Sequence, residues 1–169
     1  MADETQNVFL VDTYSDPVVM LVNGRASYLN CAPAGQFFDK MVQTGKTHIV
    51  VDFARCTSMD STFLGLLAGC ALALEQKKGT LTLTRLSERN LELVRNLGLH
   101  RILNVEADPK KLCFECEGAE KATPLTTLDK TEIANARLIL KAHENLVAAD
   151  EGNLTKFQDV ITALKQDEK

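Results

Sequence analysis

The hydrophobic pattern is strongest between Ile49 and Leu74, and the other expected elements are arranged around this stretch. Ile49, Val50 and Val51 are β-branched residues followed by a polar one, a pattern typical of a strand that is buried on both faces. From Phe63 to Leu74 the chain is almost wholly apolar, and this run is too short to span a bilayer. We therefore expect a buried strand, a short polar turn and a buried core helix, with the turn as the candidate working site.

The expected core helix begins at Asp60 or Ser61. The side chains of Asp60, Ser61 and Thr62 can accept hydrogen bonds from the free N–H groups of a first helical turn, so this trio is a strong signal for a helix start. Taken alone, the trio is an N-cap without further function. Within the helix, Gly65 and Gly69 are spaced for close packing, which we expect to occur against the sheet.

The chain before the central stretch predicts a β-hairpin and a helix. The strands are expected from Val8 to Asp12 and from Val18 to Val22, with Ser15-Asp16-Pro17 as the turn. Asn23-Gly24 is expected to end the second strand. An apolar stripe then predicts a helix from Ala34 to Gln43.

The chain after the core helix predicts a further strand–helix–strand unit. Thr80 to Thr84 alternates between polar and apolar residues, Ser87 caps an amphipathic helix that Gly98 closes, and Arg101 to Val105 predicts the last strand. Such repeats require right-handed crossovers, so the later part of the sheet should be parallel. The predicted fold class is α/β, with a small mixed β-sheet packed with helices.

The C-terminal part predicts a connector over residues 108–126 and a helical hairpin over residues 127–169. The first helix of the hairpin carries His143 on its apolar stripe, and the second begins at about Asn153. A hairpin of this size is too small to hold a good core alone. It must dock on the body of its own chain, on a second copy to make a homodimer, or on another partner.

The order of these elements and the motif at the helix start resemble the STAS domain of bacterial anti-sigma factor antagonists. The most specific part is Met59 to Gly65, M-D-S-T-F-L-G, where the family pattern is close to D-S-[ST]-G-L-G. The later turn N-L-G-L-H-R-I-L is similar to the one before the last strand of the family. The resemblance covers roughly Val8 to Val105 and implies a STAS domain over residues 1–107.

The resemblance also implies a function. In that family the serine after the aspartate is phosphorylated by an anti-sigma factor that is also a serine/threonine kinase; here that residue is Ser61, and Thr62 is the second candidate because it also carries a hydroxyl. An anti-sigma factor antagonist of this kind is not an enzyme. Its unphosphorylated form binds the kinase and releases a sigma factor, and the phosphate prevents this; a phosphatase is a further candidate partner. The alternative is an unphosphorylated STAS interaction subunit of a lipid-transport or sensory scaffold complex.

The partner-binding residues that the resemblance implies lie at the helix start and in the loop around Gly24. They are Asn23, Gly24, Arg25, Asp60, Ser61, Thr62, Phe63, Leu64 and Gly65. Two places depart from the family pattern. Phe63 replaces the first glycine of the motif, so we expect a large side chain in the path of the kinase. Residues 24–27, Gly-Arg-Ala-Ser, replace G-E-x-D, which should change the charge that the partner meets.

Composition and charge exclude several other classes. The formal net charge is −4 and charges of both signs are interspersed, so there is no basic stripe for direct binding to nucleic acid. We see no signal-peptide pattern and no apolar run suited to membrane insertion, so we expect a cytoplasmic protein with reduced cysteines.

We expect no catalytic residue, cofactor or metal site. Gly45-Lys46-Thr47 lacks the earlier glycine of a phosphate-binding P-loop. The pair Cys113 and Cys116 has redox or zinc spacing, but no second pair is nearby to complete a four-ligand zinc site. A small thiol protein that uses this pair is the weakest alternative function.

Overall fold

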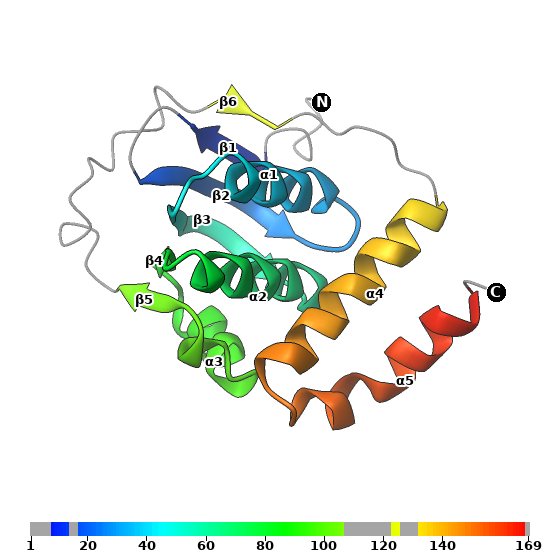
Figure 1. The fold of residues 1–169 in the computed structure, drawn as a ribbon. Coiled ribbons are helices and arrows are strands. Elements are labelled where there is room, and N and C mark those ends of the chain that lie inside the picture. Colours follow the sequence, from blue (N-terminus) through cyan, green and yellow to red (C-terminus); the bar gives the residue numbers. More distant parts are fainter. Residues whose placement is uncertain (1–7, 14–16, 107–122, 126–131, 168–169) are drawn as a thin grey trace.

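The computed structural model describes residues 8–13, 17–106, 123–125 and 132–167, and Figure 1 shows its ribbon. The elements in chain order are β1 (Phe9–Asp12), β2 (Val18–Ala26), α1 (Ala32–Gln43), β3 (His48–Met59), α2 (Ser61–Gln76), β4 (Thr80–Thr84), α3 (Glu88–Asn96), the 3-10 helix η2 (Leu99–Arg101), β5 (Asn104–Glu106), β6 (Thr123–Pro124), α4 (Glu132–Ala149) and α5 (Asn153–Asp167).

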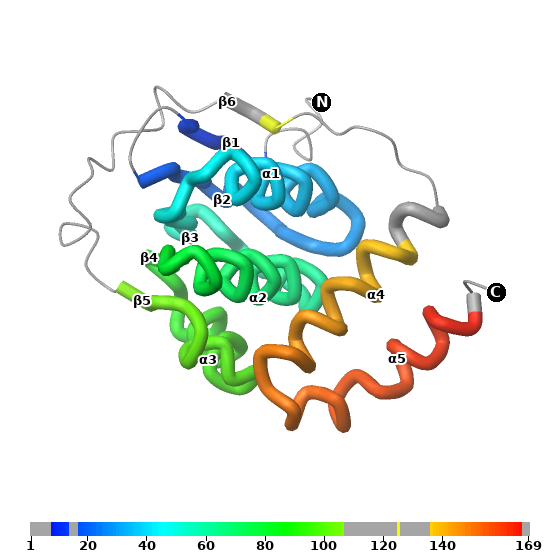
Figure 2. The backbone as a smooth tube through the Cα atoms, viewed as in Figure 1, coloured from blue at the N-terminus to red at the C-terminus, as the bar shows by residue number. Residues whose placement is uncertain are grey.

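The strands of the described residues form one mixed sheet in the order β5-β4-β3-β2-β1-β6. The pairs β2–β3, β3–β4 and β4–β5 are parallel, whereas β1 is antiparallel to both β2 and β6. Helices α1 and α2 lie side by side against the sheet, α4 crosses α2, and α5 returns beside α4 (Figures 1 and 2). The predicted α/β class, with a mixed sheet and a C-terminal helical hairpin, is confirmed.

Two predictions about the strand ends are wrong. Strand β2 does not end at Asn23-Gly24 but runs on to Ala26, and β3 replaces the expected polar turn by continuing to Met59. These polar extensions pair with each other, Asn23 opposite Arg55 and Arg25 opposite Ser58. The pairing satisfies the backbone N–H and C=O groups of segments whose side chains have little apolar character. The register shifts on both sides of Gly24, which has a φ of 99°. The predicted turn at residues 15–17 lies mostly outside the described residues.

Other boundaries differ by a few residues. Leu99–Arg101 forms a 3-10 turn after Gly98, whose φ of 72° is left-handed, so the last parallel strand begins at Asn104 instead of Arg101. Within the expected connector, Thr123–Pro124 adds to the edge of β1 as β6. Residues 107–122, which include the Cys113 and Cys116 pair, lie outside the described residues.

The Phe63 ring is fully buried in the core between the sheet and α2. It stacks on Phe9 at a centroid distance of 5.5 Å and meets Phe53 edge-on at 6.3 Å. The expectation that this side chain obstructs the path of a kinase is therefore wrong, because the ring points away from solvent. In this chain an aromatic cluster fills the space behind the helix start.

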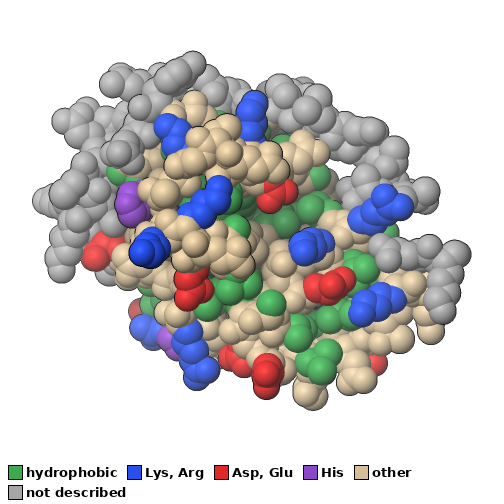
Figure 3. Space-filling model, viewed as in Figure 1, with side chains coloured by type: hydrophobic (Ala, Val, Ile, Leu, Met, Phe, Trp, Pro, Cys, Tyr) green, Lys and Arg blue, Asp and Glu red, His purple; other side chains and the backbone are tan. Residues whose placement is uncertain are grey.

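The C-terminal hairpin docks on its own chain. The inner sides of both helices are buried, including Ala142 and Leu146 on α4 and Ile161 on α5. None of the helices in the described part of the chain is long and apolar enough to cross a membrane. On the face seen in Figure 3, basic and acidic side chains of the described residues are interspersed, as the sequence suggests.

We expect Phe63→Ala to lower the free energy of unfolding by about 3–5 kcal/mol, because it removes a fully buried ring that contacts two other rings. Urea denaturation monitored by circular dichroism measures this. Leu29→Ala is the control, since the Leu29 side chain is 64% exposed and its loss should change stability by less than about 0.5 kcal/mol. Equal losses for the two variants would contradict the proposed packing of Phe63.

Candidate functional site

Asp60 ties together the two segments that form the corner of the site. Its Oδ1 accepts a hydrogen bond from the backbone N–H of Phe63 at 3.0 Å, which is the N-cap of α2, and its Oδ2 accepts one from the N–H of Tyr28 at 2.8 Å. The backbone N–H of Asp60 donates to the carbonyl of Ala26 at 3.1 Å. The carboxylate therefore fixes the loop after β2 against the start of α2. The N-cap bond to α2 is predicted by the sequence, whereas the bond to the loop is not.

Ser61 is half-buried, and its hydroxyl is held by a residue from the C-terminal hairpin. Its Oγ lies 2.9 Å from Nε2 of His143, and Nδ1 of His143 lies 2.7 Å from the carbonyl oxygen of Ile139. A carbonyl can only accept, so Nδ1 carries a proton, and in the neutral ring of that tautomer Nε2 accepts a hydrogen bond from the Ser61 hydroxyl. Sequence reasoning missed this pair; the one available signal was a histidine on an apolar stripe.

His143 is enclosed within the hairpin. Its side chain is 3% exposed, and its ring meets that of Phe157 on α5 at a centroid distance of 5.0 Å and an interplanar angle of 69°. The ring is thus fixed by Ile139, Phe157 and Ser61 at once. The C-terminal hairpin supplies part of the corner that the sequence pattern places on the N-terminal domain alone.

Two glycines of α2 let α4 come close enough for this contact. A Cβ atom on Gly65 would lie 2.1 Å from the carbonyl oxygen of Ala142, and one on Gly69 would lie 2.4 Å from Nδ2 of Asn145. That amide nitrogen also donates to the carbonyl of Gly65 at 3.2 Å. The prediction that these glycines pack against the sheet is wrong, because their bare faces meet α4.

The turn of the hairpin is anchored at the far end of α3. Asn153 is 1% exposed, and its Nδ2 donates to the carbonyls of Leu97 at 2.9 Å and Leu146 at 2.7 Å. The ammonium of Lys156 donates to the carbonyl of Asn96. Contacts at residues 142–145 of α4 and at the turn after its C-terminal end therefore hold the hairpin across α2.

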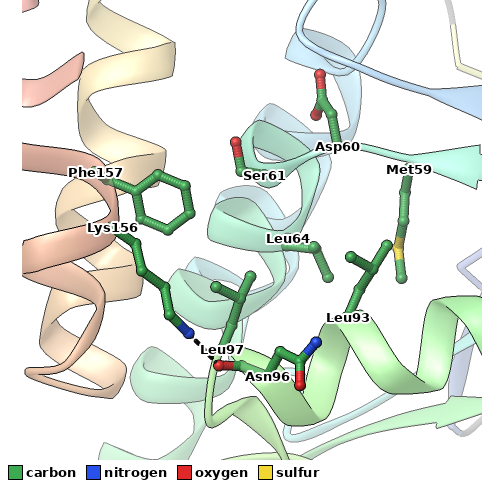
Figure 4. A pocket seen from close by; sticks show the side chains of 9 residues that line it. All are labelled: Met59, Asp60, Ser61, Leu64, Leu93, Asn96, Leu97, Lys156 and Phe157. Carbon is green, nitrogen blue, oxygen red and sulfur yellow. Dashed lines mark hydrogen bonds between the residues drawn. The ribbon is translucent and has the colours of Figure 1, made fainter. Parts of the chain in front are cut away.

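An open cleft of about 600 Å³ lies next to Ser61, between the hairpin and α3 (Figure 4). Apolar side chains form most of its wall, with the side chains of Asp60 and Ser61 on one side and that of Lys156 on the other. The lining residues are Met59, Asp60, Ser61, Leu64, Leu93, Asn96, Leu97, Lys156 and Phe157. Ser61 therefore lines an open cleft on this side of the corner.

The family model described as "Mlab, STAS domain" matches residues 9–104, which is more than half of the chain. This chain belongs to the STAS domain family. No curated protein matches it. The hairpin, α4 and α5, lies outside the residues that the family model matches.

Solved structures of anti-sigma factor antagonists share the fold of the STAS domain. The antagonist SpoIIAA in its unphosphorylated form is 20% identical with a TM-score of 0.52, over 67% of this chain and 96% of that one. The Bacillus cell fate determinant SpoIIAA in its phosphorylated form is 21% identical with a TM-score of 0.52, over 62% and 96%. A putative anti-sigma factor antagonist from Thermotoga maritima is 18% identical with a TM-score of 0.55, over 64% and 94%. At these identities the likeness concerns the fold.

The implied partner-binding residues of the STAS domain divide by exposure. Asn23 and Arg25 are exposed, whereas Gly24, Asp60 and Ser61 are half-buried. The other four, Thr62, Phe63, Leu64 and Gly65, are buried. These buried residues can shape the corner but offer little surface to a partner.

Sequence reasoning missed two exposed hydrophobic side chains at the corner. Tyr28 is 46% exposed and Leu29 is 64% exposed, in the loop that Asp60 holds. Their position directly after the Gly-Arg-Ala-Ser segment was the available signal. They add an apolar surface to the loop that is bonded to Asp60.

The described residues contain no group of three side chains that could bind a metal ion. Burial raises the pKa of the Cys70 thiol to about 12, with the Asp39 carboxylate as a second cause, and burial with the charge of Asp60 raises that of Cys31 to about 12. Both thiols therefore stay protonated and unreactive at neutral pH. They serve as small apolar side chains of the core.

We expect Asp60→Ala to lower the free energy of unfolding by about 1–2 kcal/mol, because it removes an N-cap and a second backbone hydrogen bond. Hydrogen exchange of the Tyr28 and Phe63 amides should accelerate together. Asp60→Asn, which keeps one side-chain oxygen, is the matched control and should cost less. If the Tyr28 amide keeps its protection in Asp60→Ala, the carboxylate does not hold the loop.

Proposed function

We propose that this STAS protein is an anti-sigma factor antagonist that is switched by phosphorylation of Ser61. In its unphosphorylated form it binds an anti-sigma factor that is also a serine/threonine kinase, and a sigma factor is released. The observation that carries the proposal is the position of Ser61, directly after the N-cap Asp60 and half-exposed at the corner between β3 and α2. The structure favours Ser61 over Thr62 as the acceptor, because the Thr62 side chain is 3% exposed.

The proposed transfer is an ordinary phosphoryl transfer with ATP as the donor. The Ser61 oxygen bonds to the γ-phosphorus, the bond from that phosphorus to the β-phosphate oxygen breaks, and ADP leaves. The hydroxyl proton passes to a base or to water. This chain supplies the acceptor oxygen, and the kinase supplies the rest of the chemistry.

The phosphate should change partner binding more than it changes stability. It adds about −1.5 to −2 charges and three acceptor oxygens at neutral pH. The N-terminus of α2 stabilises this charge by roughly 0.3–1 kcal/mol. At an interface beside Asp60, an imperfectly paired dianion that loses its water costs a few kcal/mol, which weakens binding on the order of a hundredfold.

The proposed docking surface is the exposed part of the corner. Tyr28 and Leu29 offer an apolar centre, Asp60 offers a negative charge next to Ser61, and Arg25, exposed near the end of β2, offers a positive charge. Aromatic residues and arginine are the types that most often carry interface energy. The basic Arg25, in place of the acidic residue of the family pattern, favours a partner with an acidic group at this point.

The second candidate function is an interaction subunit that is never phosphorylated, within a lipid-transport or sensory scaffold complex. The hydrogen bond from Ser61 to His143 favours it, because a hydroxyl that is satisfied inside its own chain can be a purely structural group. The corner would then only dock a partner. Leu154 and Val160, which are 48% and 39% exposed on α5, are the candidate surface for a homodimer through the hairpin.

Capture from a lysate of the source cells with full-length Ser61→Ala and Ser61→Asp baits tests the proposal. We expect a protein with a kinase-type ATPase fold on the Ser61→Ala bait, and, once that protein is purified, an affinity about a hundredfold weaker for Ser61→Asp. Phosphorylation of wild type at Ser61 by the purified protein and ATP should follow.

Ser87→Asp is the matched control, since Ser87 is an exposed N-cap at the start of another helix and adds the same charge. It should bind like wild type. Equal affinity of Ser61→Ala and Ser61→Asp for the kinase would contradict the switch. Equal retention of a transporter or scaffold protein by both baits would support the second candidate.

A further inference from the structure

We infer that the C-terminal hairpin is an autoinhibitory cover, and that a phosphate on Ser61 and a docked hairpin exclude each other. This inference rests on the proposed function, since it takes Ser61 as the phosphoacceptor. The hairpin lies beyond residues 9–104, which are the residues that the family model matches. Its relevance to Ser61 comes from direct contact: the Ser61 hydroxyl bonds to His143 of α4.

Phosphorylation removes the proton that makes this contact favourable. In the docked state Oγ of Ser61 lies 2.9 Å from Nε2 of His143, and with Nδ1 protonated the neutral ring accepts a hydrogen bond from the Ser61 hydroxyl. In the ester that hydrogen is replaced by phosphorus, so Oγ and Nε2 would face each other as two acceptors. The His143 ring cannot turn away, because the Ile139 carbonyl and the Phe157 ring hold its other sides and it is 3% exposed.

Helix α4 already packs against α2 as closely as the backbone atoms allow, so a phosphate on Ser61 cannot be accommodated by a closer or rearranged packing of the two helices. The carbonyl of Ala142 already lies where the Cβ of any residue other than glycine at position 65 would be. Asn145 fills the corresponding place at Gly69 and bonds to the Gly65 carbonyl. Close-packed helices shift as units, so the phosphate should move α4 outward and take α5 with it.

The charges near Ser61 also favour release. The Asp60 carboxylate lies next to Ser61 and accepts hydrogen bonds from two backbone N–H groups. Its negative charge repels an added dianion. Lys156 of α5 is the basic residue among those that line the cleft. In the docked state its ammonium donates a hydrogen bond to the Asn96 carbonyl. A clamp in which Lys156 and a protonated His143 bind the phosphate is the opposite outcome, and it would tighten the hairpin.

Linkage makes the effect reciprocal. If the phosphate favours the released hairpin, the docked hairpin disfavours the phosphate and any partner that needs the Ser61 oxygen. The free chain would then be closed. The kinase would bind only the fraction of molecules in which α4 has left α2, so its apparent affinity would be reduced by that fraction.

Hydrogen exchange of the full chain with genetically encoded phosphoserine at position 61 tests the inference. We expect amides in residues 140–149 and 153–165 to exchange at least about tenfold faster than in the unmodified chain, with β3 unchanged. Phosphoserine at position 87 is the control, since it puts the same group at the start of α3, and it should leave the hairpin protected. Unchanged or slower exchange of the hairpin in the phosphoserine-61 chain would overturn the inference.

Two uncharged variants test the docking contact separately. Gly65→Ala sets a Cβ against backbone and should release the hairpin, whereas Gly69→Ala meets the end of a flexible Asn145 side chain and should have a smaller effect. A fully protected hairpin in Gly65→Ala would also overturn the inference. Neither experiment involves a kinase, so the hairpin can respond even if no kinase is found, and the kinase switch can hold even if the hairpin does not respond.

Discussion

The close approach of α4 to α2 at Gly65 is the contact on which the site depends. Only a hydrogen atom at that position lets the Ala142 carbonyl come so near, and the approach places the next residue, His143, within 2.9 Å of the Ser61 oxygen. The anchoring of Asn153 at the end of α3 keeps the hairpin across the helix start. A glycine in the second turn of α2 thus permits the contact that holds His143 against Ser61.

Under the proposed function, the hairpin and the partner compete for one hydroxyl, that of Ser61. The hairpin is tethered to the domain, so it acts at a high effective concentration, and a separate partner must compete with it. Exposed groups at the corner, above all Tyr28 and Leu29, are the contacts that we propose for the partner once the hairpin has opened. The proposed phosphate would act on both ligands, because it adds charge to the corner and removes the donor proton that His143 accepts.

Much of this fold could be predicted from local signals. Asp60 and Ser87 cap their helices as expected, and the apolar run after Asp60 forms the buried helix α2. The orientation of Phe63 could not be predicted, since it depends on which rings of the sheet face the helix start. The continuation of β2 past Asn23 was missed because its stability comes from backbone pairing with β3 and not from apolar side chains.

The Ser61–His143 bond was out of reach for a different reason. The two residues are 82 positions apart, and a histidine on an apolar helix stripe does not reveal which element it will contact. The glycine spacing in α2 was correctly linked to close packing, but the partner could have been the sheet or α4. Long-range docking of a helical hairpin depends on shape at both surfaces, and a local pattern describes only one of them.

Disulfide trapping between α2 and α4 measures most directly the fraction of molecules in which the hairpin is closed over Ser61. A Cβ on Gly69 lies 3.0 Å from Cγ of Asn145, so Gly69→Cys with Asn145→Cys places two thiols within bonding range when the hairpin is docked. In a glutathione buffer, the effective concentration of this pair reports the docked fraction. We expect ready closure in the unmodified chain and an effective concentration at least about tenfold lower with phosphoserine at position 61. Equal values in the two chains would contradict the proposed exclusion of the docked hairpin by the phosphate.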